Sequence, residues 1–203
     1  MKIAHEEILL DASVAEHRDD VLRAHEEIKQ AIEAVKHPAG TAKFTIHPES
    51  GKKHGKGNGV VLIRKAFLSA LCATDGWQPE VRLDLAAARQ PGSVDAVRET
   101  ECGKYCVEWE TGNISSCHRS LNKMALALFK GTIAAGCVIV PSQVLRPFLT
   151  DRIANYTELE PYLDLWKAVP IKQGRLSILV VEHDEESFDV PRIPKGTDGR
   201  SLL

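Results

Sequence analysis

The stretch YCVEWETGN, residues 105–113, decides the fold. Its first part is rich in β-branched and aromatic residues, which predicts a strand over 105–110. Side chains two positions apart on a strand point to the same face, so Glu108 and Glu110 are expected to lie side by side. The Gly-Asn pair that ends the stretch turns the chain into a predicted helix over 115–130.

Further patterns surround this stretch on both sides. An alternating segment at 81–85 predicts a strand, and 86–96 has the composition of a variable loop. Wholly apolar segments at 137–140 and 176–182 predict strands buried at the centre of a sheet, and helical residues begin at 144–148. This order predicts the α/β class, with a central mixed β-sheet flanked by helices.

The remaining segments complete a single predicted domain. Apolar residues recur at helical spacing over 5–36, with a break near 11–13, and a helix is expected over 60–74. We therefore expect one domain over 1–203 with four parts: N-terminal helices (1–38), a basic loop rich in Gly and Lys (40–59), a core with the acidic pair (60–182) and an irregular tail (183–203).

Composition excludes several classes of protein. The 203 residues are 43% hydrophobic and 27% charged, as in globular proteins, and the net charge of -2 excludes a uniformly basic nucleic-acid binder. No apolar run approaches the roughly 20 residues that cross a membrane, so a cytoplasmic protein is expected. Five cysteines are too few and too scattered for a disulfide scaffold, so reduced thiols are expected.

The acidic pair has two interpretations. Two adjacent carboxylates repel each other, and a divalent cation removes that repulsion. Ligands that are all oxygen suit Mg²⁺ or Mn²⁺, which lowers the pKa of a water molecule, and Glu110 is placed to position or deprotonate that water. Taken alone, however, a Glu-x-Glu pair is more typical of the solvent-facing side of an edge strand.

A metal site needs a third acid. The hairpin that precedes Glu108 offers Glu99 and Glu101, and Asp95 and Asp84 lie further back. Spacing alone does not choose among these four.

Together, the hairpin acid, the strand with Glu108 and Glu110, the Gly-Asn pair and the helix that leads to a buried strand resemble a known nuclease family. The pattern is similar to PD-(D/E)XK nucleases, specifically the BglII–BamHI–BstYI group of type II restriction endonucleases, over about residues 52–181. The resemblance implies Glu99, Glu108 and Glu110 as catalytic acids, with Glu99 and Glu108 holding the metal. The family normally has Asp at the first position, so Glu99 departs from its pattern.

The resemblance also implies an activity and partners. We expect Mg²⁺-dependent hydrolysis of phosphodiester bonds in double-stranded DNA, with Mn²⁺ able to substitute, and a homodimer that matches a palindromic site. The dimer surface is expected on helices 60–74 or 115–130. A companion DNA methyltransferase is expected functionally, not as a stable complex.

Candidate DNA-reading residues follow from the same resemblance. Asn113 and Ser115 lie where the family reads central base pairs, and Asp151 and Arg152 where it reads an outer G·C pair. With the GATC centre shared by the group, this implies a site like GGATCC. Phosphate contacts are expected from Lys52, Lys53, Lys56 and Lys65.

Each group of candidate DNA-contacting residues also has an interpretation that does not involve DNA. Asn113 can turn the chain, Ser115 can cap the helix, Asp151 and Arg152 can form a surface charge pair, and lysines are often simply solvated. Two rival functions also remain: a non-specific repair or defence nuclease of the same fold, and a DNA-binding module whose acids hold no metal.

Overall fold

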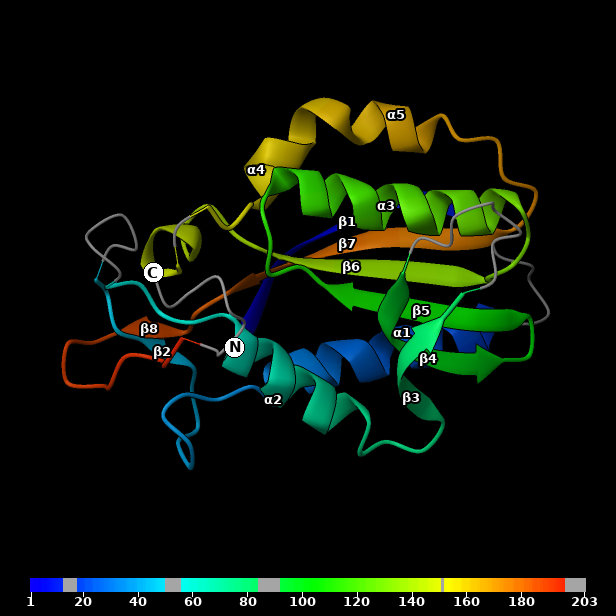
Figure 1. The fold of residues 1–203 in the computed structure, drawn as a ribbon. Helices are drawn as coiled ribbons and strands as arrows, with labels where there is room; N and C mark the ends of the chain where they lie inside the picture. Colours follow the sequence, from blue (N-terminus) through cyan, green and yellow to red (C-terminus); the bar gives the residue numbers. More distant parts are fainter. Residues whose placement is uncertain (13–17, 50–55, 84–91, 151, 196–203) are drawn as a thin grey trace.

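The computed structural model describes residues 1–12, 18–49, 56–83, 92–150 and 152–195. A six-stranded sheet forms its centre, in the order β1-β7-β6-β5-β4-β3 (Figure 1). The strands are β1 (Lys2–Ala12), β3 (Trp77–Arg82), β4 (Ser93–Thr100), β5 (Gly103–Trp109), β6 (Ala135–Pro141) and β7 (Gly174–Glu182).

The sheet is mixed, as the sequence predicts. Strands β5, β6 and β7 are parallel to one another, whereas β1, β4 and β3 are antiparallel to their neighbours. The α3 helix (Ile114–Phe129) is the crossover between β5 and β6. Every residue of β6 is buried, which is the burial expected of a strand covered on both faces.

Helices cover both faces of the sheet. Helices α1 (Arg18–Glu33) and α2 (Val61–Leu71) lie on one side, and α3, α4 (Tyr156–Leu159) and α5 (Leu163–Lys167) on the other (Figure 1). Short elements complete the chain: β2 (Thr45–Ile46) pairs with β8 (Glu185–Glu186), and 3-10 turns occupy Arg146–Phe148 and Glu160–Tyr162. No helix within the described ranges is long and apolar enough to cross a membrane.

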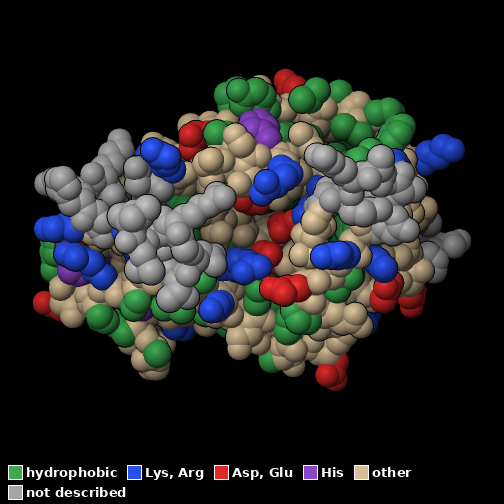
Figure 2. All heavy atoms as spheres, in the orientation of Figure 1, with side chains coloured by type: hydrophobic (Ala, Val, Ile, Leu, Met, Phe, Trp, Pro, Cys, Tyr) green, Lys and Arg blue, Asp and Glu red, His purple; other side chains and the backbone are tan. Residues whose placement is uncertain are grey.

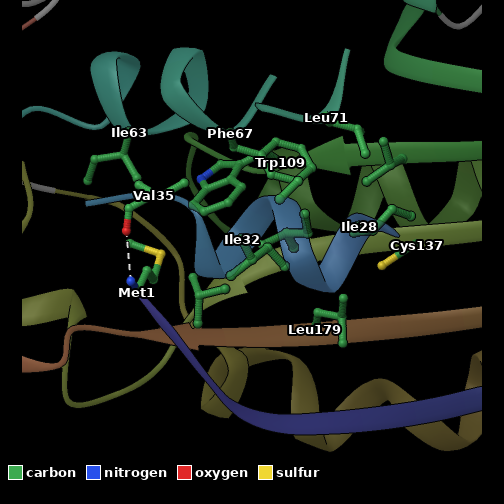
Figure 3. Close-up of a cluster of buried hydrophobic side chains, with 14 of the residues drawn as sticks. Met1, Ile28, Ile32, Val35, Ile63, Phe67, Leu71, Trp109, Cys137 and Leu179 are labelled. Atoms are coloured by element: carbon green, nitrogen blue, oxygen red, sulfur yellow. Dashed lines mark hydrogen bonds between the residues drawn. The ribbon is translucent and has the colours of Figure 1, made fainter. Parts of the chain in front are cut away.

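The core beneath α1 and α2 sets the orientation of β5. Trp109 packs in this core against Phe67, with ring centroids 5.0 Å apart (Figure 3). Tyr105 and Val107 belong to the same core. Because side chains alternate along a strand, Glu108 must point to the opposite face, toward α3. An apolar core on one face therefore directs the acids to the other.

The N-terminal segment differs from the sequence prediction. A helix was expected over 5–36, but residues 2–12 form the edge strand β1, antiparallel to β7, and the helix begins only at Arg18. Arg175 of β7 explains this, since it donates to Asp11 at 2.7 Å and to Glu6 at 3.0 Å. These contacts are remote in sequence, and they override a local helical pattern.

Two smaller predictions also change. The expected loop over 86–96 ends early, because β4 begins at Ser93; residues 84–91 lie outside the described part of the chain. The helix expected from residue 144 is a single 3-10 turn at Arg146–Phe148. All five cysteines lie within the described residues, and none of them forms a disulfide.

Candidate active site

Three carboxylates gather where β4 and β5 lie side by side. The antiparallel ladder ends with the pair Ala96 and Val107, so Asp95 and Glu108 are the next residues on the two strands, and the charge of Asp95 helps to raise the pKa of Glu108. Asp95 also accepts a hydrogen bond from the backbone N–H of Trp109 at 2.8 Å. Asp95, Glu108 and Glu110 are each at most 9% exposed. Such burial argues against the interpretation of the acidic pair as a solvent-facing strand edge.

The other candidates for the first acid lie elsewhere. Glu99 pairs with Lys104 at the far end of the hairpin, where its side chain is 67% exposed and 3.8 Å from the Lys104 ammonium group. Glu101 follows in the turn, where its backbone N–H donates to Asp20. Asp84 lies outside the described residues. The structure therefore does not bring Glu99 to Glu108 and Glu110, and it places Asp95 there instead.

Burial shifts the proton equilibria of the paired acids. Desolvation raises the pKa of Glu108 to about 7, and the nearby charges of Asp95 and Glu110 add to this while Lys123 opposes it. Desolvation likewise raises the pKa of Glu110, against the hydrogen bond from Ser120. A buried cluster of like charges favours protonation or a bound cation.

Basic and polar side chains hold each acid. Arg64 of α2 donates two hydrogen bonds to Asp95, from Nε at 3.0 Å and from Nη2 at 2.5 Å. Lys123 of α3 forms an ion pair with Glu108, and the Ser120 hydroxyl donates to Glu110. Each carboxylate thus has its own donor, which fixes its direction.

An open pocket of about 480 Å³ lies over Glu108 and Glu110. Figure 2 shows acidic side chains in a hollow near the middle of the view, with basic side chains around it. The pocket is lined by Gly92, Ser93, Glu108, Glu110, Arg119, Ser120 and Lys123. A polyanion can therefore approach the carboxylates while basic groups offset its charge.

The donor set fits a hard divalent cation. All three acids offer oxygen ligands, which Mg²⁺ and Mn²⁺ prefer. Among the described residues, no three His, Cys, Asp or Glu side chains are already arranged as metal ligands.

The candidate base-reading residues lie at the start of α3. Asn113 is its N-cap and accepts a hydrogen bond from the Ser116 N–H at 3.3 Å, so the capping role expected of Ser115 belongs to Asn113. Both Asn113 and Ser115 are exposed. Ala154 donates to the Gly112 carbonyl at 3.0 Å, which places the segment after Arg152 next to this helix start.

Arg152 is exposed and has a left-handed backbone with φ of 69°, a conformation uncommon outside glycine. Its neighbour Asp151 lies outside the described residues. The candidate phosphate contacts are dispersed: Lys65 is exposed on α2, and Lys56 pairs with Glu49 at 2.8 Å. Lys52 and Lys53 lie outside the described ranges.

Sequence reasoning missed the side chains that hold the acids. Arg64, Ser120 and Lys123 were not singled out, and Arg119 was not placed at the pocket. On α3 a signal was present, since Ser116, Ser120 and Lys123 are polar at helical spacing i, i+4 and i+7. Arg64 offered no comparable pattern, because only the packing of α2 brings it to Asp95.

Comparisons with known proteins agree with this geometry. The family described as restriction endonuclease BamHI matches residues 1–200. The type II restriction enzyme OkrAI of Oceanobacter kriegii is 38% identical over 202 residues, covering 100% of both chains. The type II restriction enzyme BamHI of Bacillus amyloliquefaciens is 33% identical over 210 residues, covering 99% of this chain and 93% of that enzyme.

A solved structure supports the fold independently. The restriction endonuclease BglII in complex with a DNA 16-mer superimposes with a TM-score of 0.62 at 13% identity, covering 91% of this chain and 79% of BglII. The predicted restriction-endonuclease-like fold is therefore confirmed.

Proposed function

Because the chain belongs to the BamHI family of type II restriction endonucleases, we propose that it uses Mg²⁺ to hydrolyse double-stranded DNA at a palindromic, GATC-centred site such as GGATCC. The observation that carries this proposal is the buried cluster of Asp95, Glu108 and Glu110, of which Glu108 and Glu110 line an open pocket that also presents Arg119. Mn²⁺ is expected to substitute for Mg²⁺.

The three acids have different roles in this proposal. Asp95 and Glu108 hold the cation, and Glu110 orients water and accepts its proton, a role suited to a carboxylate whose pKa is raised. Ser120 keeps Glu110 in place through its hydroxyl group. When bound, Mg²⁺ supplies the positive charge that stabilises the developing charge on the phosphate and makes water a nucleophile near neutral pH. We propose Asp95, and not Glu99, as the first acid.

We assign base reading to the start of α3 and to residues shortly before Ala154. Asn113 and Ser115 would read the central base pairs, and Asp151 with Arg152 the outer G·C pair. The hydrogen bond between Ala154 and Gly112 supports this assignment, since it brings two distant segments to one edge of the site. Lys52, Lys53, Lys56 and Lys65 are proposed to contact phosphates.

A homodimer would present two such sites to a palindrome. Large apolar side chains are exposed on α3 and on the neighbouring segment that ends in α5: Leu126, Phe129, Tyr162 and Leu165. Hydrophobic side chains gather along the upper edge of the view in Figure 2, over α5. This favours the 115–130 helix over 60–74 as the dimer surface. A companion methyltransferase would protect the host's own sites.

Digestion of a plasmid of known sequence with Mg²⁺, followed by sequencing of the ends, tests the proposal. We expect discrete fragments that end at GATC-centred palindromes, and no cleavage by Glu108→Ala, which should still bind DNA. A smear would indicate a non-specific nuclease. Discrete ends outside any GATC-centred site would refute the proposed specificity, and undiminished cleavage by Glu108→Ala would refute the proposed site.

A further inference from the structure

Lys123 occupies an unusual position for a lysine. It lies in the middle of α3, is only 7% exposed, and ends among the carboxylates. Its ammonium group forms an ion pair with Glu108 and donates to the Ser93 carbonyl at 2.9 Å. Buried lysines are rare and need a partner, so this placement requires an explanation beyond packing.

We propose that Lys123 is the resident cation of the acid cluster: in the metal-free protein its ammonium group occupies the position at Glu108 that a divalent cation takes, and it thereby sets the metal affinity of the site. The inference rests on the proposed metal-dependent function. Lys123 acts here as a positioning residue, since it works through Glu108 and not on the DNA.

The charges of the site support this role. Asp95 is neutralised by Arg64 and Glu108 by Lys123, whereas Glu110 has a neutral donor in Ser120. The two cations come from helices on opposite faces of the sheet, α2 and α3. The protein's own positive charges thus stabilise the cluster and partly compensate for the burial of three acids.

Competition follows from the geometry. A divalent cation held by Glu108 would meet the positive charge of the Lys123 ammonium group at the same carboxylate, so the two cations would compete for it. Lys123 has room to leave, because its side chain also lines the 480 Å³ pocket and its long stem is flexible. Arg64 is less free to leave, since it makes two hydrogen bonds to an acid that is also fixed by the Trp109 backbone.

A purely structural lysine would behave differently. If Lys123 only fastened α3 to the sheet, its loss would destabilise the protein equally with and without metal, and metal affinity would not rise. If Lys123 is the resident cation, its loss should change the stability of the metal-free protein and the metal affinity in opposite directions. Its removal weakens the metal-free state alone and strengthens metal binding, on the order of tenfold or more for a unit charge this close.

The test is direct titration of Mn²⁺ by calorimetry on the full chain, without DNA, at pH 8.5, where protons compete least for Glu108. The variants are Lys123→Met, Lys123→Gln and Lys123→Arg. Lys123→Gln keeps a hydrogen-bond donor, so it can fold even if Lys123→Met does not. Lys172→Met is the matched control, because it removes the same charge from an exposed loop before β7.

We expect Lys123→Met and Lys123→Gln to bind Mn²⁺ about tenfold more tightly than the unmodified chain, with Lys123→Arg and Lys172→Met unchanged. The rise in melting temperature between EDTA and Mn²⁺ should be larger in the two neutral variants. Equal or weaker Mn²⁺ binding in both overturns the inference and leaves the metal site intact. If the unmodified chain shows no Mn²⁺ binding that Glu108→Gln abolishes, the proposed metal site fails and the inference fails with it.

Discussion

Glu108 illustrates how burial and neighbouring charges act on one residue. Desolvation raises its pKa from 4.5 to about 7, with Asp95 and Glu110 adding to the shift. The folded state therefore binds a proton more tightly than the unfolded state does. A contribution of this sign is present below pH 4.5 and is lost as the pH rises toward 7.

The pH dependence of folding follows from this shift. We expect the metal-free protein to lose about 3 kcal/mol of stability from Glu108 between pH 4.5 and 7.5. Glu108→Gln should remove that loss, because it cannot ionise. Urea unfolding in EDTA at several pH values measures the difference. If the two proteins change in parallel with pH, Glu108 does not titrate as described.

The identity of the first acid is a second prediction for single residues. Asp95→Asn should reduce cleavage by more than about a hundredfold, since it removes a charged oxygen ligand from the cluster. Glu99→Gln is the matched control: it also removes one charge from β4, but from an exposed position. Initial rates on a defined plasmid measure both. A large loss in Glu99→Gln with little loss in Asp95→Asn would contradict the assignment.

Among the elements, the start of α3 carries a helix cap and a proposed DNA contact on the same residue, Asn113. Asn113 caps the helix through its side-chain oxygen, and it is also the proposed reader of a central base. Asn113→Ala should cost about 1 kcal/mol of stability. Asn113→Asp keeps the accepting oxygen and loses the amide donor, so it should retain stability while cleavage falls.

Thermal melts and cleavage rates separate these tasks. If Asn113→Asp cleaves like the unmodified chain, Asn113 serves the helix only. Ser116 is a useful comparison, because its side chain lies beside Gly112, at the same helix start, and it is not assigned to DNA. Ser116→Ala should change cleavage less than Asn113→Asp does.

Strand β1 shows why some elements escape prediction. Leu9 and Leu10 are buried, but the neighbouring acids also suit a helix. Its conformation is decided by pairing with β7, which lies more than 160 residues away in sequence. Strand β5 and helix α3 were predictable, because their patterns are local and repeat at strand or helix periods.

At the scale of the whole molecule, the exposed apolar side chains of α3 and α5 predict assembly. Phe129 is 57% exposed and Leu165 is 66% exposed. Replacing both by Lys should convert a dimer to a monomer, because burying unpaired charges opposes association. Sedimentation velocity measures the mass in solution. Cleavage of both strands at a palindrome should fall with the loss of the dimer.

Phe188→Lys provides the control for this prediction. Phe188 is 71% exposed and packs edge-on against His47, near β8 and away from α3. It should leave the dimer intact. A monomeric unmodified chain, or a dimer that survives the double replacement, would refute this surface.

The sequence by itself determined the α/β class, the strand with Glu108 and Glu110, and the crossover helix after it. These depend on local periodicity and on residues close together in the chain. Only the tertiary structure shows which of the candidate acids within the described residues lies with Glu108 and Glu110. Asp95 lies just beyond the end of the β4–β5 ladder, next to Trp109 and Glu108, whereas Glu99 pairs with Lys104 toward the turn of the hairpin.

The partners of the acids were also decided by packing. Arg64 and Lys123 come from helices on opposite faces of the sheet. Each lies far in sequence from the acid with which it forms an ion pair. The interaction of a buried charge depends on distance in space, which the order of residues does not reveal. The stretch at 105–113 therefore contains Glu108 and Glu110, and the fold around it brings Arg64 and Lys123 to the acids of the site.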